Sequence, residues 1–527
     1  MVSITSPDTA KLARTLVAYD PGATIARAAG LLTAPHLQAN ALRLELLVHL
    51  AVAHCTGKKM PGDREIGRWL NRYLGTTQLA RLEDPAEDVF VTNIETPEGN
   101  RRIFEGIWES NDYFLQIALD TLMSHEAPQA CRDLLGPAFA LLRLSECVAE
   151  RLDLRRWHIE PSNAHGLVRV GSETDLAERA LAVTFTGEDL ERLGVARGTL
   201  APFVIRQEEK AALVDQCTGH SSLERSPLVN FGDVLVLALP PAVSPAIRRF
   251  VMSELRRTGY LQAFGDALGA LQACQVENEG LSEMKNQAAT IPSPPPDGEL
   301  MPSFHAWLLR YDRNKYLHVV LLHDRLDWAD EQGLDSVVQY AESFRDIFER
   351  YVKKVAAHCQ TRPDFVAGMT LVITGGIGRG SMLAFRDWPD EWSLSSIGIT
   401  DLLMLARNPG QPLKRYLKCM KQKEEAEEKG VYFQDLNGDF NFYCYWCDRN
   451  YQLIPRFASV GGTTKISIGN DFVAPFRQEL RNLLDQHVVQ TVSGSFAQVM
   501  RLARDSYFKS LRGQPIYASN GVRLPLE

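Results

Sequence analysis

Residues 304–322 read FHAWLLRYDRNKYLHVVLL, and this stretch decides the fold. Two apolar runs, residues 304–311 and 316–322, flank the polar, turn-forming sequence Asp312-Arg313-Asn314-Lys315. Short runs rich in aliphatic and aromatic residues on either side of such a turn are typical of a β-hairpin. The sequence therefore predicts two antiparallel strands at these positions.

A helix and a third strand follow the hairpin. Apolar residues recur at helical spacing from Val337 to Val355, in a segment that ends near His358, and residues 369–374 form an aliphatic and β-branched run. A strand, a crossover helix and a second strand of one sheet form a right-handed unit with parallel strands. We therefore expect the strands at 316–322 and 369–374 to end at the same edge, where open α/β sheets bind ligands.

Polar residues directly follow both of these strands. His323 and Asp324 follow the first, and Gly376, Gly378 and Arg379 follow the second. Imidazole and carboxylate groups act as acids, bases or metal ligands, while arginine and glycine-rich backbone bind anions. The residues are therefore candidate catalytic and anion-binding groups, and the alternative is that they only turn the chain. The glycines do not form a nucleotide motif, because the third glycine of the dinucleotide fingerprint and the Gly-Lys-Ser/Thr of the P-loop are both missing.

A second candidate anion site lies earlier in the chain. Arg248, Arg249, Arg256 and Arg257 belong to a predicted helix that begins at Ser244, a residue suited to a helix N-cap. Four arginines on one helix are candidates for phosphate contacts. The alternative is an ordinary solvated face of an amphipathic helix.

The sequence as a whole predicts a mixed α/β protein in four regions. These are a mostly helical domain at 1–160, an α/β domain at 161–290, an α/β core at 299–410 and an α+β C-terminal region at 411–527. The proline-rich run at 291–298 precedes the core as a linker or surface loop. In the last region, Asn437-Gly438 predicts a hairpin between residues 431–436 and 439–446, and residues 494–511 predict a final helix.

Composition excludes several classes of protein. The 527 residues contain 57 Lys+Arg and 65 Asp+Glu, a net charge of −8, which argues against coating nucleic acid through bulk charge but allows a local basic face. Nine cysteines are too few for a disulfide scaffold, and no second pair completes Cys444-x-x-Cys447 as a zinc site. No window approaches the ~20 apolar residues of a membrane span. We expect a cytoplasmic protein with no membrane partner.

The order of predicted elements resembles the core of the restriction endonuclease-like nuclease superfamily, over about a quarter of the chain. The elements are a helix at 244–271, strands at 273–277, 304–311 and 316–322, a helix at 337–358 and a strand at 369–374. The resemblance implies an Asp on the second core strand and a Glu-x-Lys on the third, which bind Mg²⁺ and position water. This chain departs from that pattern, because its second strand has no Asp before Asp312 in the turn and its third strand ends at Leu322-His323-Asp324.

Two nonstandard sites remain open as alternatives. The only nearby Glu-x-Lys is Glu283-Met284-Lys285, in a polar stretch before the proline-rich loop. Asp312, His323 and Asp324 offer carboxylate and imidazole ligands for a divalent metal. Either site would use Mg²⁺ or Mn²⁺ as its cofactor.

The leading interpretation is a protein with a degenerate restriction endonuclease-like core that acts in nucleic-acid handling or defence through binding nucleic acid or other protein subunits. The second is an active metal-dependent nuclease with a displaced site. The third is a protein–protein scaffold with no nucleic-acid role.

Overall fold

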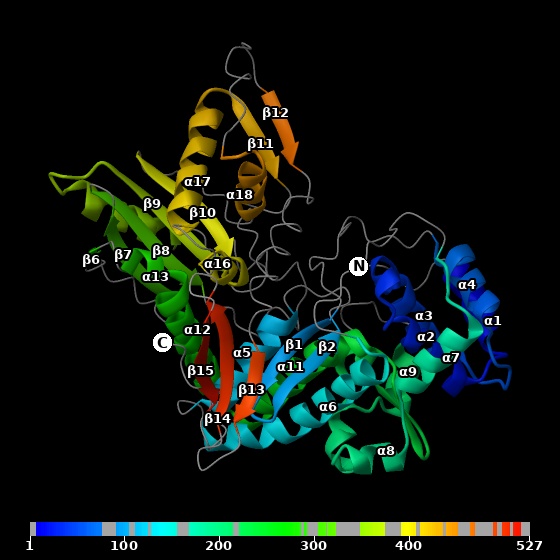
Figure 1. Cartoon of the computed structure of the whole chain (residues 1–527). Helices are drawn as coiled ribbons and strands as arrows, with labels where there is room; N and C mark the ends of the chain where they lie inside the picture. The colour runs from blue at the N-terminus through cyan, green and yellow to red at the C-terminus, as the bar shows by residue number, and fades with distance from the viewer. Residues whose placement is uncertain are drawn as a thin grey trace. The chain divides into compact units, whose positions relative to one another are not determined.

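The computed structural model forms two compact units, residues 1–264 and 265–527 (Figure 1). It describes residues 7–75, 91–104, 111–124, 128–154, 168–213, 221–285, 289–291, 304–311, 314–322, 348–374, 391–406, 412–435, 439–451, 464–468, 488–492, 498–505 and 510–517. Helices and several small sheets make it a mixed α/β protein, as predicted. The division into four regions stays a prediction. Among the described residues, no helix has both the length and the apolar character needed to span a bilayer.

The first unit is mainly helical. Its α-helices are α1 (Pro7–Leu16), α2 (Pro21–Leu31), α3 (Ala41–His54), α4 (Asp63–Arg72), α5 (Asn111–Met123), α6 (Leu135–Arg151), α7 (Glu173–Ala182), α8 (Gly187–Arg192), α9 (Gln207–Ala212), α10 (Ser222–Arg225) and α11 (Val243–Thr258). Two small antiparallel sheets accompany them: β1 (Val91–Thr96) with β2 (Gly99–Phe104), and β3 (Thr184–Phe185), β5 (Val234–Leu237) and β4 (Leu228–Phe231).

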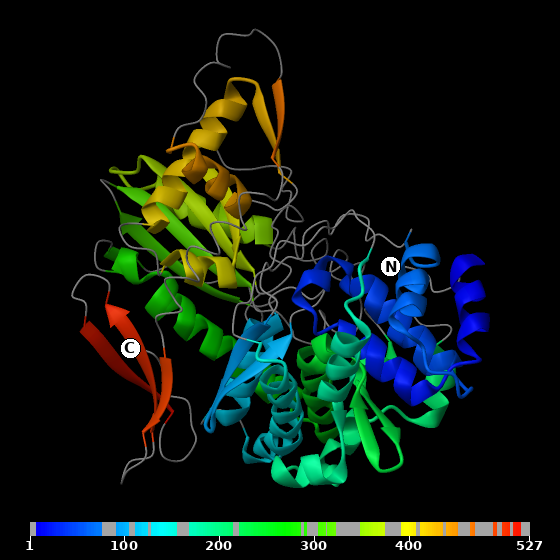
Figure 2. The same ribbon diagram turned by 45° about the vertical axis from the view of Figure 1, so that its right-hand side comes forward.

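A five-stranded mixed sheet forms the centre of the second unit (Figure 2). Its strands run in the order β10 (Trp392–Gly398), β9 (Ala367–Thr374), β8 (Lys315–Leu322), β7 (Phe304–Tyr311) and β6 (Ala289–Ile291). β7 pairs antiparallel with β6 and β8, whereas β8, β9 and β10 are parallel. The predicted hairpin and the predicted parallel third strand are both confirmed.

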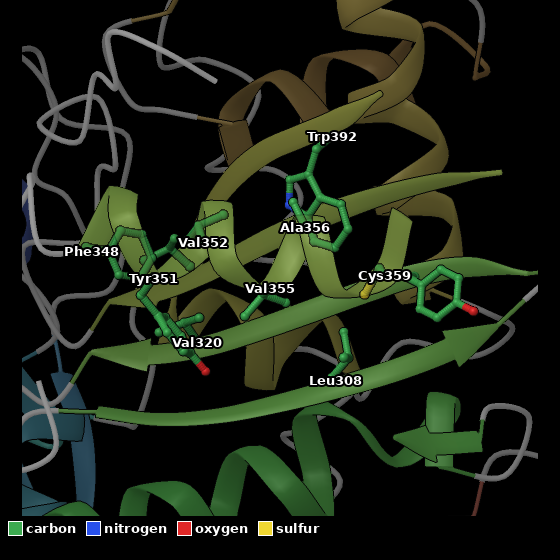
Figure 3. Packing of buried hydrophobic residues seen from close by; sticks show 11 residues of the cluster. Leu308, Val320, Phe348, Tyr351, Val352, Val355, Ala356, Cys359 and Trp392 are labelled. Carbon is green, nitrogen blue, oxygen red and sulfur yellow. The ribbon is translucent and has the colours of Figure 1, made fainter. Parts of the chain in front are cut away.

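Helix 348–360 covers one face of this sheet (Figure 3). Its apolar side chains are buried against residues of the strands: Phe348, Tyr351, Val352, Val355, Ala356 and Cys359 from the helix, and Leu308, Tyr316, Val320, Val372 and Trp392 from the sheet. The spacing of the helix residues is the one that predicted a helix ending near His358. The predicted part at 337–347 lies outside the described residues.

The opposite face of β10 meets a different helix, α17 (Pro412–Glu428). Side chains alternate along a strand, so Trp392 and Leu394 join the core under helix 348–360 while Ser393 and Ser395 point the other way. Ser393 Oγ donates to Glu424 Oε2 of α17 at 2.7 Å. The sheet therefore has helices on both faces at β10.

The second unit has further elements, the first of which begins at Leu261, just before the boundary between the units. They are α12 (Leu261–Gln275), a π-helical turn at Val276–Gly280, α13 (Ser282–Lys285), α16 (Ile399–Ala406), α18 (Asp439–Asp448), the parallel pair β11 (Val431–Asp435) and β12 (Thr464–Ile468), and the antiparallel sheet of β13 (Val488–Val492), β14 (Gln498–Asp505) and β15 (Ser510–Tyr517).

Several local predictions are wrong. The helix predicted at 244–271 is two helices, because Gly259 takes a left-handed conformation (φ 78°) that ends α11. The strand predicted at 273–277 is helical, and the first strand of the meander is β6. Residues 439–446 form α18 rather than the second arm of a hairpin, and strands β14 and β15 cover part of the helix predicted at 494–511.

Candidate functional site

The predicted edge site follows the ends of β8 and β9. The two strands are parallel neighbours with Leu321 paired to Ile373, so the chain leaves both at the same edge of the sheet. The candidate residues themselves lie outside the described residues: Asp312, His323, Asp324, Gly376, Gly378 and Arg379. Their roles stay predictions.

The Glu-x-Lys candidate lies on a helix, not on a strand. Glu283 and Lys285 belong to α13, and the Glu283 carboxylate accepts hydrogen bonds from the backbone amides of Leu413 at 2.8 Å and Lys414 at 3.4 Å. These amides open α17, where the first N–H groups of a helix lack partners within the helix. Glu283 therefore caps α17 with a negative charge at the end that the helix dipole favours.

Replacing Glu283 with alanine should lower the free energy of unfolding of the second unit by about 1–2 kcal/mol, because two amides of α17 lose their acceptor. Urea denaturation measures this loss. Glu425→Ala, which removes a carboxylate from the exposed side of the same helix, is the control and should change stability by less than about 0.5 kcal/mol. Equal effects of the two substitutions would contradict the capping role.

The four candidate arginines do not form one exposed face. Arg248 and Arg249 are only 5% and 8% exposed. The Arg248 guanidinium lies 5.6 Å from the ring centroid of Phe114, and Arg249 Nη1 lies 3.5 Å from Glu224 Oε2. The other two, Arg256 and Arg257, are exposed at the end of α11, and Arg257 pairs with Glu254 at 2.6 Å. A solvated face thus describes the second pair and not the first, and phosphate binding by any of them stays a prediction.

A histidine–serine pair is buried in the first unit, and the spacing of the sequence does not reveal it. His49 Nε2 lies 2.6 Å from Ser221 Oγ, and Nδ1 lies 2.7 Å from the carbonyl oxygen of Glu45. Burial lowers the pKa of His49, which favours the neutral ring. His49 and Ser221 are 1% and 0% exposed, and Ser221 Oγ also accepts from the Glu224 amide at the start of α10. The pair therefore joins α3 to α10 and offers no open nucleophile.

A polar network fixes α17 and α18 to β10 in the second unit. Asp439, the first residue of α18, accepts from Ser395 Oγ at 2.8 Å and from Lys423 Nζ at 2.7 Å. The Tyr416 hydroxyl donates to the carbonyl oxygen of Ser396 at 3.0 Å and lies 2.9 Å from Ser395 Oγ. Burial raises the pKa of Tyr416 well above its ordinary value, so this hydroxyl stays protonated. The network holds the partly buried Lys423 against Asp439.

The other side of α17 is exposed and basic. Arg415, Lys418 and Lys421 recur at intervals of three, and all three are exposed. Residues three apart lie close together on a helix surface, so the three cations form one stripe. Sequence reasoning missed this stripe, which begins at Arg415. Helical spacing of the cations within 412–428 is the signal that locates it.

The described residues contain no group of three His, Cys, Asp or Glu side chains suited to a metal ion. Cys444 and Cys447 lie one turn apart on α18, and within the described residues neither forms a disulfide. Metal binding is thus unsupported within the described ranges. The Mg²⁺ or Mn²⁺ of the nuclease interpretation would depend on residues outside them.

These features define the class of the protein: an α/β chain with a mixed sheet between helices and an exposed basic helix beside its edge strand. The chain belongs to the anti-phage protein Upx-like family, whose match extends over residues 2–524. It is therefore a defence-related protein. No curated protein and no solved structure matches the sequence.

Proposed function

We propose that this defence protein acts by binding nucleic acid through its second unit, on a restriction endonuclease-like core without the catalytic carboxylates of that superfamily. The connectivity supports this proposal. An antiparallel meander of β6, β7 and β8 leads through a segment that includes helix 348–360 to β9, which is parallel to β8. This is the order of strands and helix that the resemblance implies, with β6 as the first strand.

One observation supports a core that lacks the catalytic carboxylates: strands β6 to β10 contain no Asp or Glu. The superfamily needs a carboxylate on its second strand and a Glu-x-Lys on its third, because metal-assisted hydrolysis of a phosphodiester depends on carboxylate ligands. Here the second strand is β7 and the third is β8, with the sequences FHAWLLRY and KYLHVVLL. Binding without cleavage is the activity that such a core supports.

A second candidate function is an active nuclease with a displaced site. The parallel pairing of β8 with β9 favours it, because His323 and Asp324 directly follow β8 in the sequence and Gly376, Gly378 and Arg379 follow β9. A metal site at that edge would take its ligands from residues that follow the strands in the sequence, and not from the strands themselves. A third, a protein scaffold, predicts neither binding nor cleavage.

The purified protein should bind labelled DNA or RNA in the presence of EDTA and leave it intact in the presence of Mg²⁺ or Mn²⁺. Affinity should fall steeply with salt, because cations that contact phosphates displace counterions. Cleavage that requires metal and disappears in Asp324→Ala, but not in the exposed control Asp133→Ala, would establish the displaced nuclease instead. Absence of binding to single- or double-stranded DNA and RNA at ~50 mM salt would overturn both the nucleic-acid-binding and the nuclease hypotheses. The protein scaffold would then be the remaining candidate.

A further inference from the structure

Helix α17 carries its charges in the order opposite to the one that stabilises a helix. Its basic residues occupy the first three turns and its acidic residues the end: Lys414, Arg415, Lys418, Lys421 and Lys423, then Glu424, Glu425, Glu427 and Glu428. The first turn has no acidic residue and the last has no basic one. The helix dipole favours the reverse order. Helix stability therefore does not explain this pattern, and a local rule broken in this way is typical of a functional surface.

The basic stripe of α17 is available to a ligand. Within the part of the chain that the structure describes, no carboxylate forms an ion pair with Arg415, Lys418 or Lys421, whereas Lys423 pairs with Asp439 at 2.7 Å. Glu283 already occupies the amides at the start of the helix. An anion would thus meet the side chains of the stripe and not the helix end.

An aromatic ring lies beside this stripe in an unusual conformation. Asn450 and Tyr451 close α18 with left-handed backbones (φ 53° and 63°), and their amides donate to the carbonyl oxygens of Cys447 and Trp446 at 3.0 and 2.9 Å. This conformation suits asparagine but is rare for a residue as bulky as tyrosine. Tyr451 is 47% exposed, and the Arg415 guanidinium lies 5.7 Å from its ring centroid. The fold thus holds a tyrosine ring at the surface, next to the first cation of the stripe.

We propose that Arg415, Lys418, Lys421 and Tyr451 form a binding surface for single-stranded nucleic acid. The lysines contact successive phosphates, and an unpaired base stacks on the Tyr451 ring, with Arg415 held against that ring. This inference rests on the proposed nucleic-acid binding and specifies its location and the form of the partner.

The chemistry of the surface favours a single strand over a duplex. Cations attract the phosphates of both, but an aromatic ring at the surface gains stacking energy only from a base whose face is uncovered. Bases in a duplex are already stacked on one another. Stacking on a ring also tolerates any base and either sugar, so the surface does not by itself distinguish DNA from RNA.

The experiment measures binding of the full chain to fluorescent 20-nucleotide oligo(dT), oligo(U) and a 20-base-pair DNA duplex over a salt series. Tyr451→Asn should weaken binding of at least one single strand about 5- to 150-fold, while Tyr451→Phe should keep wild-type affinity. Asparagine tolerates the left-handed backbone, so the variant should fold, as its thermal melting curve would show. An oligo(dT) with abasic sites should bind the wild type and Tyr451→Asn equally.

The phosphate contacts are tested separately. Lys418→Ala/Lys421→Ala should reduce the slope of log affinity against log salt by about 1.4, because each phosphate contact on a single strand contributes about 0.7. Lys58→Ala/Lys429→Ala removes the same charge from exposed positions outside the stripe and should leave the slope unchanged.

The possible failures are distinguishable. If the wild type binds none of the three probes, the proposed function fails as a whole. If it binds but Tyr451→Asn and Lys418→Ala/Lys421→Ala bind as the wild type does, the surface assigned here is wrong and nucleic-acid binding stands. Equal loss of duplex and single-strand binding in Tyr451→Asn would overturn the preference for a single strand.

Discussion

Replacing Gly368 with alanine is expected to lower the free energy of unfolding of the second unit by about 3 kcal/mol. A Cβ atom at this position of β9 would lie 2.2 Å from the Cε3 and Cζ3 atoms of the Trp392 ring. Carbon atoms pack at about 3.5–4.0 Å, so one of the two strands has to shift. The side chain of Trp392 has no room to yield, because the residue is only 3% exposed.

Two contacts hold the Trp392 ring in place. It stacks parallel to Phe365, with ring centroids 6.3 Å apart, and its Nε1 donates to Thr370 Oγ1 at 2.9 Å. Displacing the ring would cost this hydrogen bond as well as the packing. Urea denaturation followed by tryptophan fluorescence measures the loss.

The control for this prediction is Gly265→Ala. Gly265 lies in α12, and a Cβ atom there would meet no atom of the described residues within 4 Å. Alanine should therefore stabilise the helix by up to about 1 kcal/mol. The prediction is refuted if Gly368→Ala unfolds at the same urea concentration as the wild type.

The second unit should lose stability in acid because of one buried histidine. His318 of β8 is 0% exposed, its Nδ1 lies 3.2 Å from Thr370 Oγ1, and its ring meets that of Tyr351 edge to face at 5.4 Å. Among the residues that the structure describes, Nε2 has no hydrogen-bond partner. Burial lowers the pKa of His318 from 6.5 to about 3, because a charged ring would lose its hydration.

The sign of the effect follows from proton binding. Below about pH 6.5 the unfolded chain binds a proton on His318, whereas the folded chain binds it only near pH 3, so stability falls as the pH falls. The shift corresponds to a loss of about 5 kcal/mol at pH 3, nearly all of it in the window between the two pKa values. Above that window the contribution of His318 is constant.

Urea midpoints at pH 7, 5.5 and 4.5 test this prediction. His318→Leu should flatten the pH dependence of the second unit relative to the wild type. His358→Leu, which removes an exposed histidine from helix 348–360, should retain it. If both variants keep the wild-type slope, the acid sensitivity belongs to other groups.

Local patterning predicted the centre of the second unit correctly. The runs at 304–311 and 316–322 pair antiparallel across a turn in which Asn314 takes φ 76°. The crossover rule then fixed β9 as parallel to β8. Short-range sequence was sufficient here because neighbouring segments pair with each other.

Tertiary contacts overrode the local signals elsewhere. The aromatic run at 439–446 has high strand propensity after Asn437-Gly438, but Asp439 is held by Ser395 and Lys423, and the ring of Tyr443 packs 5.5 Å from that of Tyr416. Strand propensity reflects side-chain packing more than an intrinsic backbone preference. Residues 439–446 therefore form a helix, in which these side chains have their partners, rather than a strand.

The same limit applies to the candidate site. Glu283-Met284-Lys285 carries the residue types of a nuclease motif, and only the fold shows Glu283 capping α17. Within α17, the sequence cannot distinguish Lys423, which pairs with Asp439, from Lys418 and Lys421, which do not. Exposure and pairing are properties of the folded chain, and the proposed surface depends on both.

Because β8 pairs with a strand that comes much later in the sequence, β8 emerges from the ribosome before its parallel partner β9. About 45 residues separate Leu322 from Ala367, so at ~5–20 residues per second the ribosome needs roughly 2–9 seconds to deliver the partner of β8 after the hairpin has emerged. During that interval the edge of β8 that later pairs with β9 lacks its hydrogen-bond partner, and Tyr316 and Val320 lack the side chains of helix 348–360 that later bury them. Slower codons between the two strands would lengthen this exposure.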